Sequence, residues 1–196
     1  MSATGERRER DRAHRHQLII TAARDLAETE GWDAVTTRRL AERVEYSQPV
    51  LYSHFDGKDA IVGAVALAGF DDLATHLRHA RQSAPDRPLR ALCRAYLGFA
   101  TERPALYQAM FILPTDLKFA STETPPPLRA AFDEFVSCFR PDNERRELFA
   151  EVLWSALHGI AVLSDSGRIP LSGQEQRLDF LVDRLADTTP PMQAPT

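Results

Sequence analysis

Residues 46–58 read YSQPVLYSHFDGK, and this stretch decides how the first part of the chain is interpreted. A proline comes early in it, and an Asp-Gly pair interrupts the pattern near its end. On a helical wheel of about 100° per residue, Leu51 and Phe55 share one apolar stripe, and Tyr52 and His54 lie on its two flanks. The stretch therefore predicts a short helix that has one buried face and carries hydrogen-bond donors beside it.

Two further helices are predicted before this one. Apolar residues recur at helical spacing over about 14–30, where Gly31 ends the pattern, and over about 36–44, where Thr36 suits the N-cap position. A turn of three or four residues then leads to the helix at about 48–55, which Ser47 can cap. Three helices with this short connection between the second and third form a helix-turn-helix, which indicates DNA binding.

In a helix-turn-helix the third helix lies in the major groove. Small and apolar groups at its tip can contact thymine methyls and base edges, and Gln48 can pair with adenine. Tyr52 and His54 can donate to phosphates, and free amides at the start of the second helix favour an anion. The predicted DNA-binding residues are Thr36, Thr37, Arg38, Ser47, Gln48, Pro49, Val50, Tyr52, Ser53, His54 and Lys58.

The stretch TTRRLAERVEYSQPVLYSHFDGKDAI at 36–61 resembles the DNA-binding domain of the TetR family of transcriptional regulators. The residues that carry the resemblance are Thr36, Thr37, Leu40, Ala41, Leu51, Tyr52, His54, Phe55 and Lys58. The resemblance covers about 14–62. Many members have Gly-Val-Ser in the turn, whereas this chain has Glu45-Tyr46-Ser47. Glu45 must therefore accept a conformation that glycine adopts more easily.

The later part of the chain resembles one subgroup of the same family. The segments ERPALYQAMF at 102–111 and LWSALHGIAVL at 153–163 are similar to the regulatory domain named for a Trp-His-Gly motif, here Trp154, His158 and Gly159. Trp154 and His158 share a helix face, either as core residues or as the lining of an effector pocket. The candidate ligand-binding residues are Phe70, Tyr96, Phe99, Tyr107, Phe111, Trp154 and His158.

The predicted helix at 142–164 is apolar on two faces, so one face can serve the chain's own core and the other a partner. Another apolar stripe follows at 173–187. The family resemblance implies that these two helices pair with their copies in a homodimer, and the alternative is that both are buried in the monomer. The candidate interface residues are Leu148, Val152, Ser155, Gly159, Leu178, Leu181, Val182 and Leu185.

Composition limits the other possibilities. The net charge is −4, so a DNA site must be a local patch. Cys93 and Cys138 lie far apart in helical patterns, which indicates reduced core thiols. The N-terminus has no apolar signal segment, and the apolar stretch at 60–70 is shorter than the ~20 residues of a membrane span. We expect a cytoplasmic protein without a membrane partner, a metal or another cofactor.

These observations predict an all-α chain with four parts: a disordered arm at 1–13, a three-helix DNA-binding domain at 14–57, a larger effector-binding and dimerisation domain at 58–188, and a disordered tail at 189–196. The arm, which contains RRERDRAHRH, is either a solvated tail or a contact to DNA. The expected function is a homodimeric repressor that binds a palindromic operator and is released by a small apolar effector.

The alternative is an all-α ligand-binding or enzymatic protein with a vestigial helix-turn-helix. No catalytic residue is expected, because Ser155 and His158 stand on a helix without the Gly-x-Ser-x-Gly turn of a nucleophile elbow.

Overall fold

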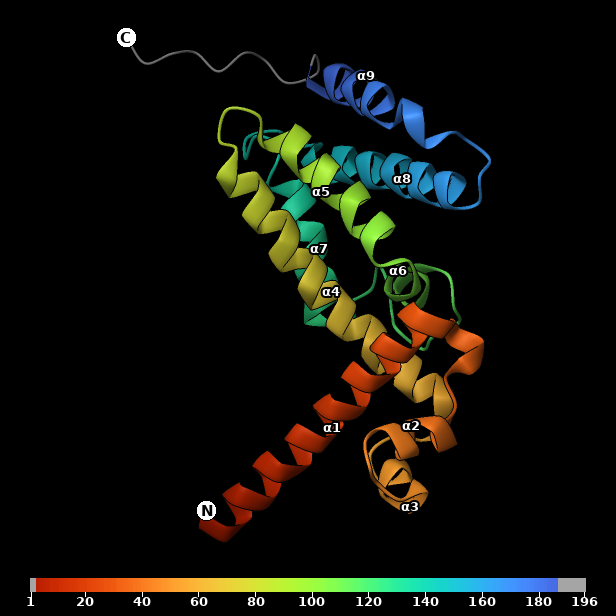
Figure 1. Cartoon of the computed structure of the whole chain (residues 1–196). Coiled ribbons are helices and arrows are strands. Elements are labelled where there is room, and N and C mark those ends of the chain that lie inside the picture. Colours follow the sequence, from red (N-terminus) through yellow and green to blue (C-terminus); the bar gives the residue numbers. More distant parts are fainter. Residues whose placement is uncertain (1–2, 187–196) are drawn as a thin grey trace. The chain divides into compact units, whose positions relative to one another are not determined.

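The computed structural model describes residues 3–186, and over that range the chain consists of helices and connections without a strand (Figure 1). The predicted all-α class is confirmed. The helices form two compact units. The first comprises the residues up to Gly69 together with Arg103–Glu123, and the second comprises Phe70–Glu102 and the residues from Thr124 onward. The tail predicted at 189–196 lies outside the described residues.

The first unit contains α1 (Ala3–Glu30), η1 (Trp32–Ala34), α2 (Thr37–Arg43), α3 (Gln48–Tyr52), the first part of α4 (Gly57–Ser83) and α6 (Pro104–Phe111). The second contains the rest of α4, α5 (Pro88–Glu102), α7 (Pro126–Val136), α8 (Arg146–Asp165), η2 (Leu171–Gly173) and α9 (Gln174–Ala186). Three of these helices begin at a proline, because the first turn of a helix does not use the missing N–H.

Helix α1 is longer than the sequence predicted. The segment 1–13 was expected to be disordered, but the helix begins at Ala3. Arginine, glutamate and alanine are strong helix formers, and extending an existing helix needs no new nucleation. The 28 residues of α1 span about 42 Å at 1.5 Å per residue. Only the second half is buried, through Ile19, Ala23 and Leu26.

Two side chains of the first unit attach α6 to the end of α1. The carboxylate of Glu28 accepts hydrogen bonds from the backbone N–H groups of Ala105, at 3.1 Å, and Leu106, at 2.9 Å. The indole Nε1 of Trp32 donates to the carbonyl oxygen of Ala105 at 2.8 Å. The N-cap residue Arg103 makes no side-chain cap of its own, so Glu28 satisfies amides at the start of α6 that would otherwise lack partners.

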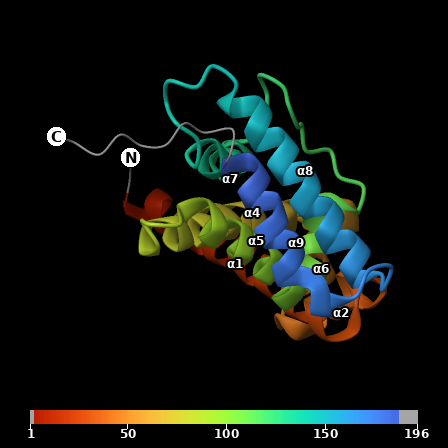
Figure 2. The ribbon, with the colours of Figure 1, turned by 90° about the horizontal axis from the view of Figure 1, so that it is seen from above.

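In the second unit α5 packs against α8 and α9, and α7 packs against α8. The view from above shows α8 and α9 side by side (Figure 2). Tyr96 and Phe135 meet edge to face in the core, with ring centroids 5.6 Å apart. The buried carboxylate of Glu134 accepts from both Arg78 and Arg81, so its charge is paired as burial requires.

Two helices, α4 and α8, are long and apolar enough to cross a membrane by length and composition alone, a test that core helices of globular proteins also pass. The apolar window is 50% buried within the chain in α4 and 22% buried in α8. Cys93 and Cys138 are free thiols, as predicted, and burial raises the pKa of Cys138 to about 12.

Candidate nucleic-acid interface

Helix α3 has the faces that the helical wheel predicted. Leu51 is 0% exposed and Phe55 is 4% exposed, so both belong to the core. Gln48 and Pro49 at the start of the helix are exposed, and Tyr52 at its end is 54% exposed. The structure therefore presents the tip of α3 and one flanking phenol to the solvent, while the opposite face anchors the helix.

Hydroxyl groups from two helices meet beside this tip. The phenol oxygen of Tyr52 lies 3.4 Å from Oγ1 of Thr37, the first residue of α2. Thr36 is the N-cap of α2, and its side chain accepts a hydrogen bond from the Arg39 backbone N–H at 3.2 Å. The predicted cap is confirmed, and Tyr52 and Thr37 place two hydroxyls at the helix N-terminus, where an anion is favoured.

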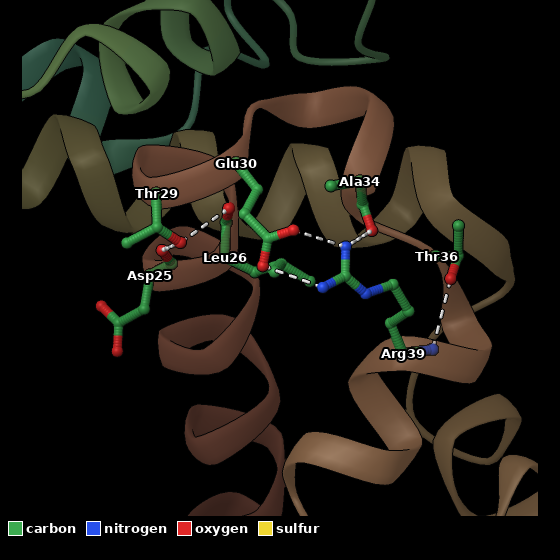
Figure 3. A network of polar contacts seen from close by, with 7 residues as sticks. All are labelled: Asp25, Leu26, Thr29, Glu30, Ala34, Thr36 and Arg39. Atoms are coloured by element: carbon green, nitrogen blue, oxygen red, sulfur yellow. Dashed lines mark hydrogen bonds and ion pairs between the residues drawn. The ribbon is translucent and has the colours of Figure 1, made fainter.

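Arg39, which was not among the predicted site residues, joins α2 to α1 through side-chain hydrogen bonds (Figure 3). Its guanidinium donates to the two carboxylate oxygens of Glu30, at 2.8 and 3.0 Å, and to the carbonyl oxygen of Ala34 at 3.5 Å. The hydrogen bond from Arg39 lowers the pKa of Glu30. The bidentate pair fixes the start of α2, which carries Thr36 and Thr37.

The turn between α2 and α3 agrees with one prediction and corrects another. Glu45 has a φ of 58°, which confirms that it occupies a conformation favoured by glycine. Ser47 is the N-cap of α3 but makes no side-chain cap. Pro49 has no N–H to offer, and the N–H of Val50 donates to the Ser47 carbonyl oxygen instead.

Two of the predicted phosphate contacts already have polar partners inside the chain, and a third is partly buried. The Lys58 ammonium donates to the carbonyl oxygen of Trp32 and is half-buried. Arg38 pairs with Glu42 at 3.1 Å on the surface. The Nδ1 atom of His54 is buried without a hydrogen-bond partner, and burial is the main reason that the pKa of His54 is lowered. Phosphate binding by His54 would therefore use its Nε2.

The remaining predicted DNA contacts on and after α3 differ in exposure. Val50 is half-buried, and Ser53 is exposed, with its hydroxyl donating to the Val50 carbonyl oxygen at 2.6 Å. A hydroxyl that donates within the chain can still accept, so Ser53 stays a predicted contact.

The candidate ligand-binding residues are divided between the units. Tyr107 and Phe111 belong to the first unit, with ring centroids 4.7 Å apart, and the other five belong to the second. There, Trp154 Nε1 donates to the Tyr96 phenol oxygen at 3.1 Å. Burial lowers the pKa of His158, one turn further along α8. Tyr96, Phe99 and Phe70 are buried in the core. This is consistent with packing residues rather than with ligand contacts.

The candidate interface residues on α8 are accessible, but two of those on α9 are not. Leu148 is 54% exposed and Val152 is 50% exposed. Leu178 and Leu185 are 1% and 8% exposed and pack in the chain's own core, so the single chain does not present them to a partner. The exposed apolar residue of α9 is instead Phe180, at 63%.

The other candidate interface residues differ in exposure. Ser155 is exposed, whereas Gly159, Leu181 and Val182 are half-buried. An open groove of about 740 Å³ between α8, η2 and α9 is lined by Ala156, Ile160, Pro170, Ser172, Gly173, Gln176, Arg177, Phe180 and Leu181.

Comparison with known proteins identifies the family of this chain. Residues 19–65 match the model of bacterial regulatory proteins of the tetR family, and residues 89–188 match that of the tetracyclin repressor-like C-terminal domain. The expected Trp-His-Gly subgroup is not confirmed. An uncharacterised HTH-type transcriptional regulator of Mycobacterium tuberculosis is 29% identical over 157 residues, 77% of this chain and 70% of that protein. The class A tetracycline repressor protein from Escherichia coli is 47% identical over 58 residues, 30% of this chain and 27% of that protein.

Two solved structures share the fold. A protein of unknown function from Rhodococcus sp. RHA1 has a TM-score of 0.72 at 22% identity, over 90% of this chain and 95% of that one. A TetR variant from Acinetobacter baumannii AYE, in complex with minocycline, has a TM-score of 0.59 at 22% identity, over 87% of this chain and 93% of that one. With its helix-turn-helix and both family matches, this chain belongs to the TetR family of transcriptional regulators.

Proposed function

We propose that this chain is a cytoplasmic, ligand-responsive repressor that binds a palindromic operator as a homodimer. The observation that carries the proposal is the surface around α3: an exposed tip at Gln48 and Pro49, beside a hydroxyl pair formed by Tyr52 and Thr37. Groups at the tip suit base edges, and the hydroxyls suit phosphates. Membership of a family of transcriptional regulators argues against an enzyme with a vestigial helix-turn-helix.

The dimer is proposed from the exposed apolar side chains of α8 and α9. Leu148, Val152 and Leu163 on α8 and Phe180 on α9 are each at least 40% exposed. Large apolar side chains exposed on two neighbouring helices are what a protein-protein interface requires. A palindromic operator presents two half-sites about 34 Å apart or slightly more, so binding it needs two α3 helices, one from each copy.

The effector is proposed to be a small, mainly apolar molecule held in the second unit. Trp154 and His158 supply an aromatic surface and a polar group on one helix face, and a β-carbon added at Gly159 would meet no atom of another residue's side chain within 4 Å. A TetR variant with the same fold binds minocycline, which supports the proposal that a small molecule is the effector here. A coupling of ~1–3 kcal/mol is enough to change operator affinity ~5- to 150-fold.

The first experiment tests DNA binding. Fluorescence anisotropy is measured with labelled DNA from the region upstream of the chain's own gene and with a scrambled duplex of equal length. We expect specific binding at least about 10³-fold tighter than binding to the scrambled duplex. Gln48→Ala should weaken only specific binding. Equal affinity for both duplexes in wild-type protein would overturn the proposal.

The second experiment tests the effector site. A panel of small apolar molecules, with minocycline included, is titrated into the preformed DNA complex, and release is followed by anisotropy. His158→Ala should raise the concentration that releases DNA while leaving DNA affinity without the molecule nearly unchanged. An unaltered release curve for a molecule that acts on wild-type protein would show that His158 is only a core residue.

A further inference from the structure

The first half of α1 lies against the end of α3, the helix proposed to enter the major groove. The guanidinium Nη2 of Arg12 donates to the carbonyl oxygen of Ser53, the residue after α3, at 3.4 Å. The His16 ring stacks on Phe55, with centroids 4.3 Å apart, and lies 6.1 Å from the His54 ring. These contacts bring residues of the segment expected to be disordered, and its immediate neighbours, beside the DNA-facing surface.

Two arginines and two histidines meet at this junction. Burial lowers the pKa of His54, and the nearby Arg12, His16 and Arg15 lower it further. Within residues 3–186, neither Arg12 nor Arg15 forms an ion pair with a carboxylate. Both guanidinium groups can therefore still bind an external anion at the end of α3.

Seven arginines elsewhere in the described part of the chain pair with a carboxylate, namely Arg38, Arg39, Arg78, Arg81, Arg90, Arg94 and Arg140. Like charges placed together repel, so an external anion stabilises the neighbouring guanidinium groups of Arg12 and Arg15. Because these arginines lie beside the end of α3, the anion expected there is a DNA phosphate.

We propose that Arg12 and Arg15, together with His16 and His54, form a second phosphate-binding cluster that extends the DNA-contacting surface along α1. The proposal rests on the proposed operator binding and adds residues to it. The family model of the DNA-binding domain begins at residue 19, so Arg12, Arg15 and His16 lie outside the matched segment.

The arrangement around α3 explains why a second cluster is useful. Tyr52 contacts α2 through Thr37, whereas Ser53 and His54 contact α1 through Arg12 and His16. The two sets of donors thus come from different elements on either side of the end of α3. A helix in the major groove has a phosphate backbone on each side, about 12 Å apart. Donors on two sides can hold it in register.

Salt dependence provides the test, because each lost phosphate contact lowers the slope of log affinity against log salt by about 0.9. The test variant is Arg12→Ala/Arg15→Ala. The control is Arg7→Ala/Arg10→Ala, in which Arg10 lies on the opposite side of α1 from Arg12 and the same net charge is lost. Alanine favours the helix, so both variants should fold, which circular dichroism verifies. Affinity is measured between 50 and 200 mM salt, about the range over which such contacts are resolved.

The Arg12→Ala/Arg15→Ala variant should bind operator and scrambled DNA less tightly by a similar factor, about tenfold or more at low salt, with the slope reduced by about two for each protomer. The control should keep a slope close to that of wild-type protein. An unchanged slope for the test variant, or an equal reduction in the control, would overturn the cluster while leaving operator binding intact. Absence of DNA binding by wild-type protein would instead overturn the proposed function, and the cluster with it.

Discussion

The indole Nε1 of Trp32 donates a 2.8 Å hydrogen bond to the carbonyl oxygen of Ala105. Trp32 is 6% exposed, and its own carbonyl oxygen accepts from the Lys58 ammonium. One residue of η1 therefore joins the first turn of α6 to the start of α4, all within the first unit. The position of Lys58, a predicted phosphate contact, depends on this arrangement.

Replacing Trp32 by phenylalanine should destabilise the first unit. The Trp32→Phe variant keeps an aromatic ring but leaves the buried Ala105 carbonyl without its donor, so the free energy of unfolding should fall by about 1–3 kcal/mol. Urea unfolding followed by circular dichroism measures it. Trp154→Phe, which removes the same donor from a half-buried site, serves as the control and should lose less. Equal losses would mean that the burial of the Ala105 carbonyl adds nothing to the cost of losing the indole.

Removing the hydroxyl of Tyr52 should weaken DNA binding without changing its specificity. Tyr52→Phe removes an exposed hydroxyl that contacts Thr37 at 3.4 Å, so the fold should be retained. Loss of one phosphate hydrogen bond of about 0.5–1.5 kcal/mol corresponds to a roughly 2- to 12-fold weaker complex. Anisotropy with operator and scrambled DNA should show the same factor for both. A loss confined to the operator would make Tyr52 a base-reading residue.

The sequence was sufficient where structure is set by local periodicity. The spacing of Leu51 and Phe55 alone predicted the buried face of α3, and Thr36 predicted a helix start. Helix α8 was expected from residue 142 but begins at Arg146, because backbone turns at Asn143 and Arg146 occupy the preceding segment. Periodicity continues through such a turn, so it does not locate the boundary.

Other features depend on contacts between distant segments. Glu28 meets the amides of α6 across 77 residues of sequence, and no pattern around Glu28 indicates this. The stripe on α9 could face either the chain's own core or a second copy, and only the packing of α5 on α9 shows that Leu178 and Leu185 face the core. A periodic stripe reveals that a face is buried but not what covers it.

Charge placed on the exposed apolar face of α8 and α9 should give a monomer. Val152→Arg/Phe180→Arg introduces two charges at residues that are 50% and 63% exposed, so each protomer should still fold. Sedimentation at micromolar concentration should show a dimer for wild-type protein and a monomer for the variant, which should also lose operator binding. Ile112→Arg, at 53% exposure in the first unit, is the matched control and should stay dimeric. A wild-type monomer would refute the proposed interface.

Relieving the backbone of Glu45 should stabilise the turn before α3. Its φ of 58° is costly for a residue with a side chain and free of that penalty for glycine. The gain is partly offset by the greater freedom of glycine in the unfolded chain, so Glu45→Gly should add up to about 1 kcal/mol. Glu45→Ala, which removes the charge but keeps the β-carbon, should not share the gain. Thermal unfolding that ranks the two variants equally would assign the effect to charge.

Acid should destabilise the protein through two histidines. The pKa of His54 is lowered from 6.5, first by burial and then by Arg12, His16 and Arg15, and burial lowers the pKa of His158. Because the unfolded chain binds protons more readily at these sites, the free energy of unfolding rises with pH across this range. The stabilisation is fully present above the unfolded value of 6.5 and is lost as pH falls through it toward the folded pKa.

Urea unfolding over a series from about pH 7.5 to 5 should therefore show decreasing stability, since that interval brackets the histidine range. His54→Gln and His158→Gln should each flatten the curve in part, because glutamine takes up no proton in either state. The double variant should be flatter than both, and the two effects should add, because the groups lie in different units. Wild-type stability that stayed constant or increased toward pH 5 would contradict the burial of both rings.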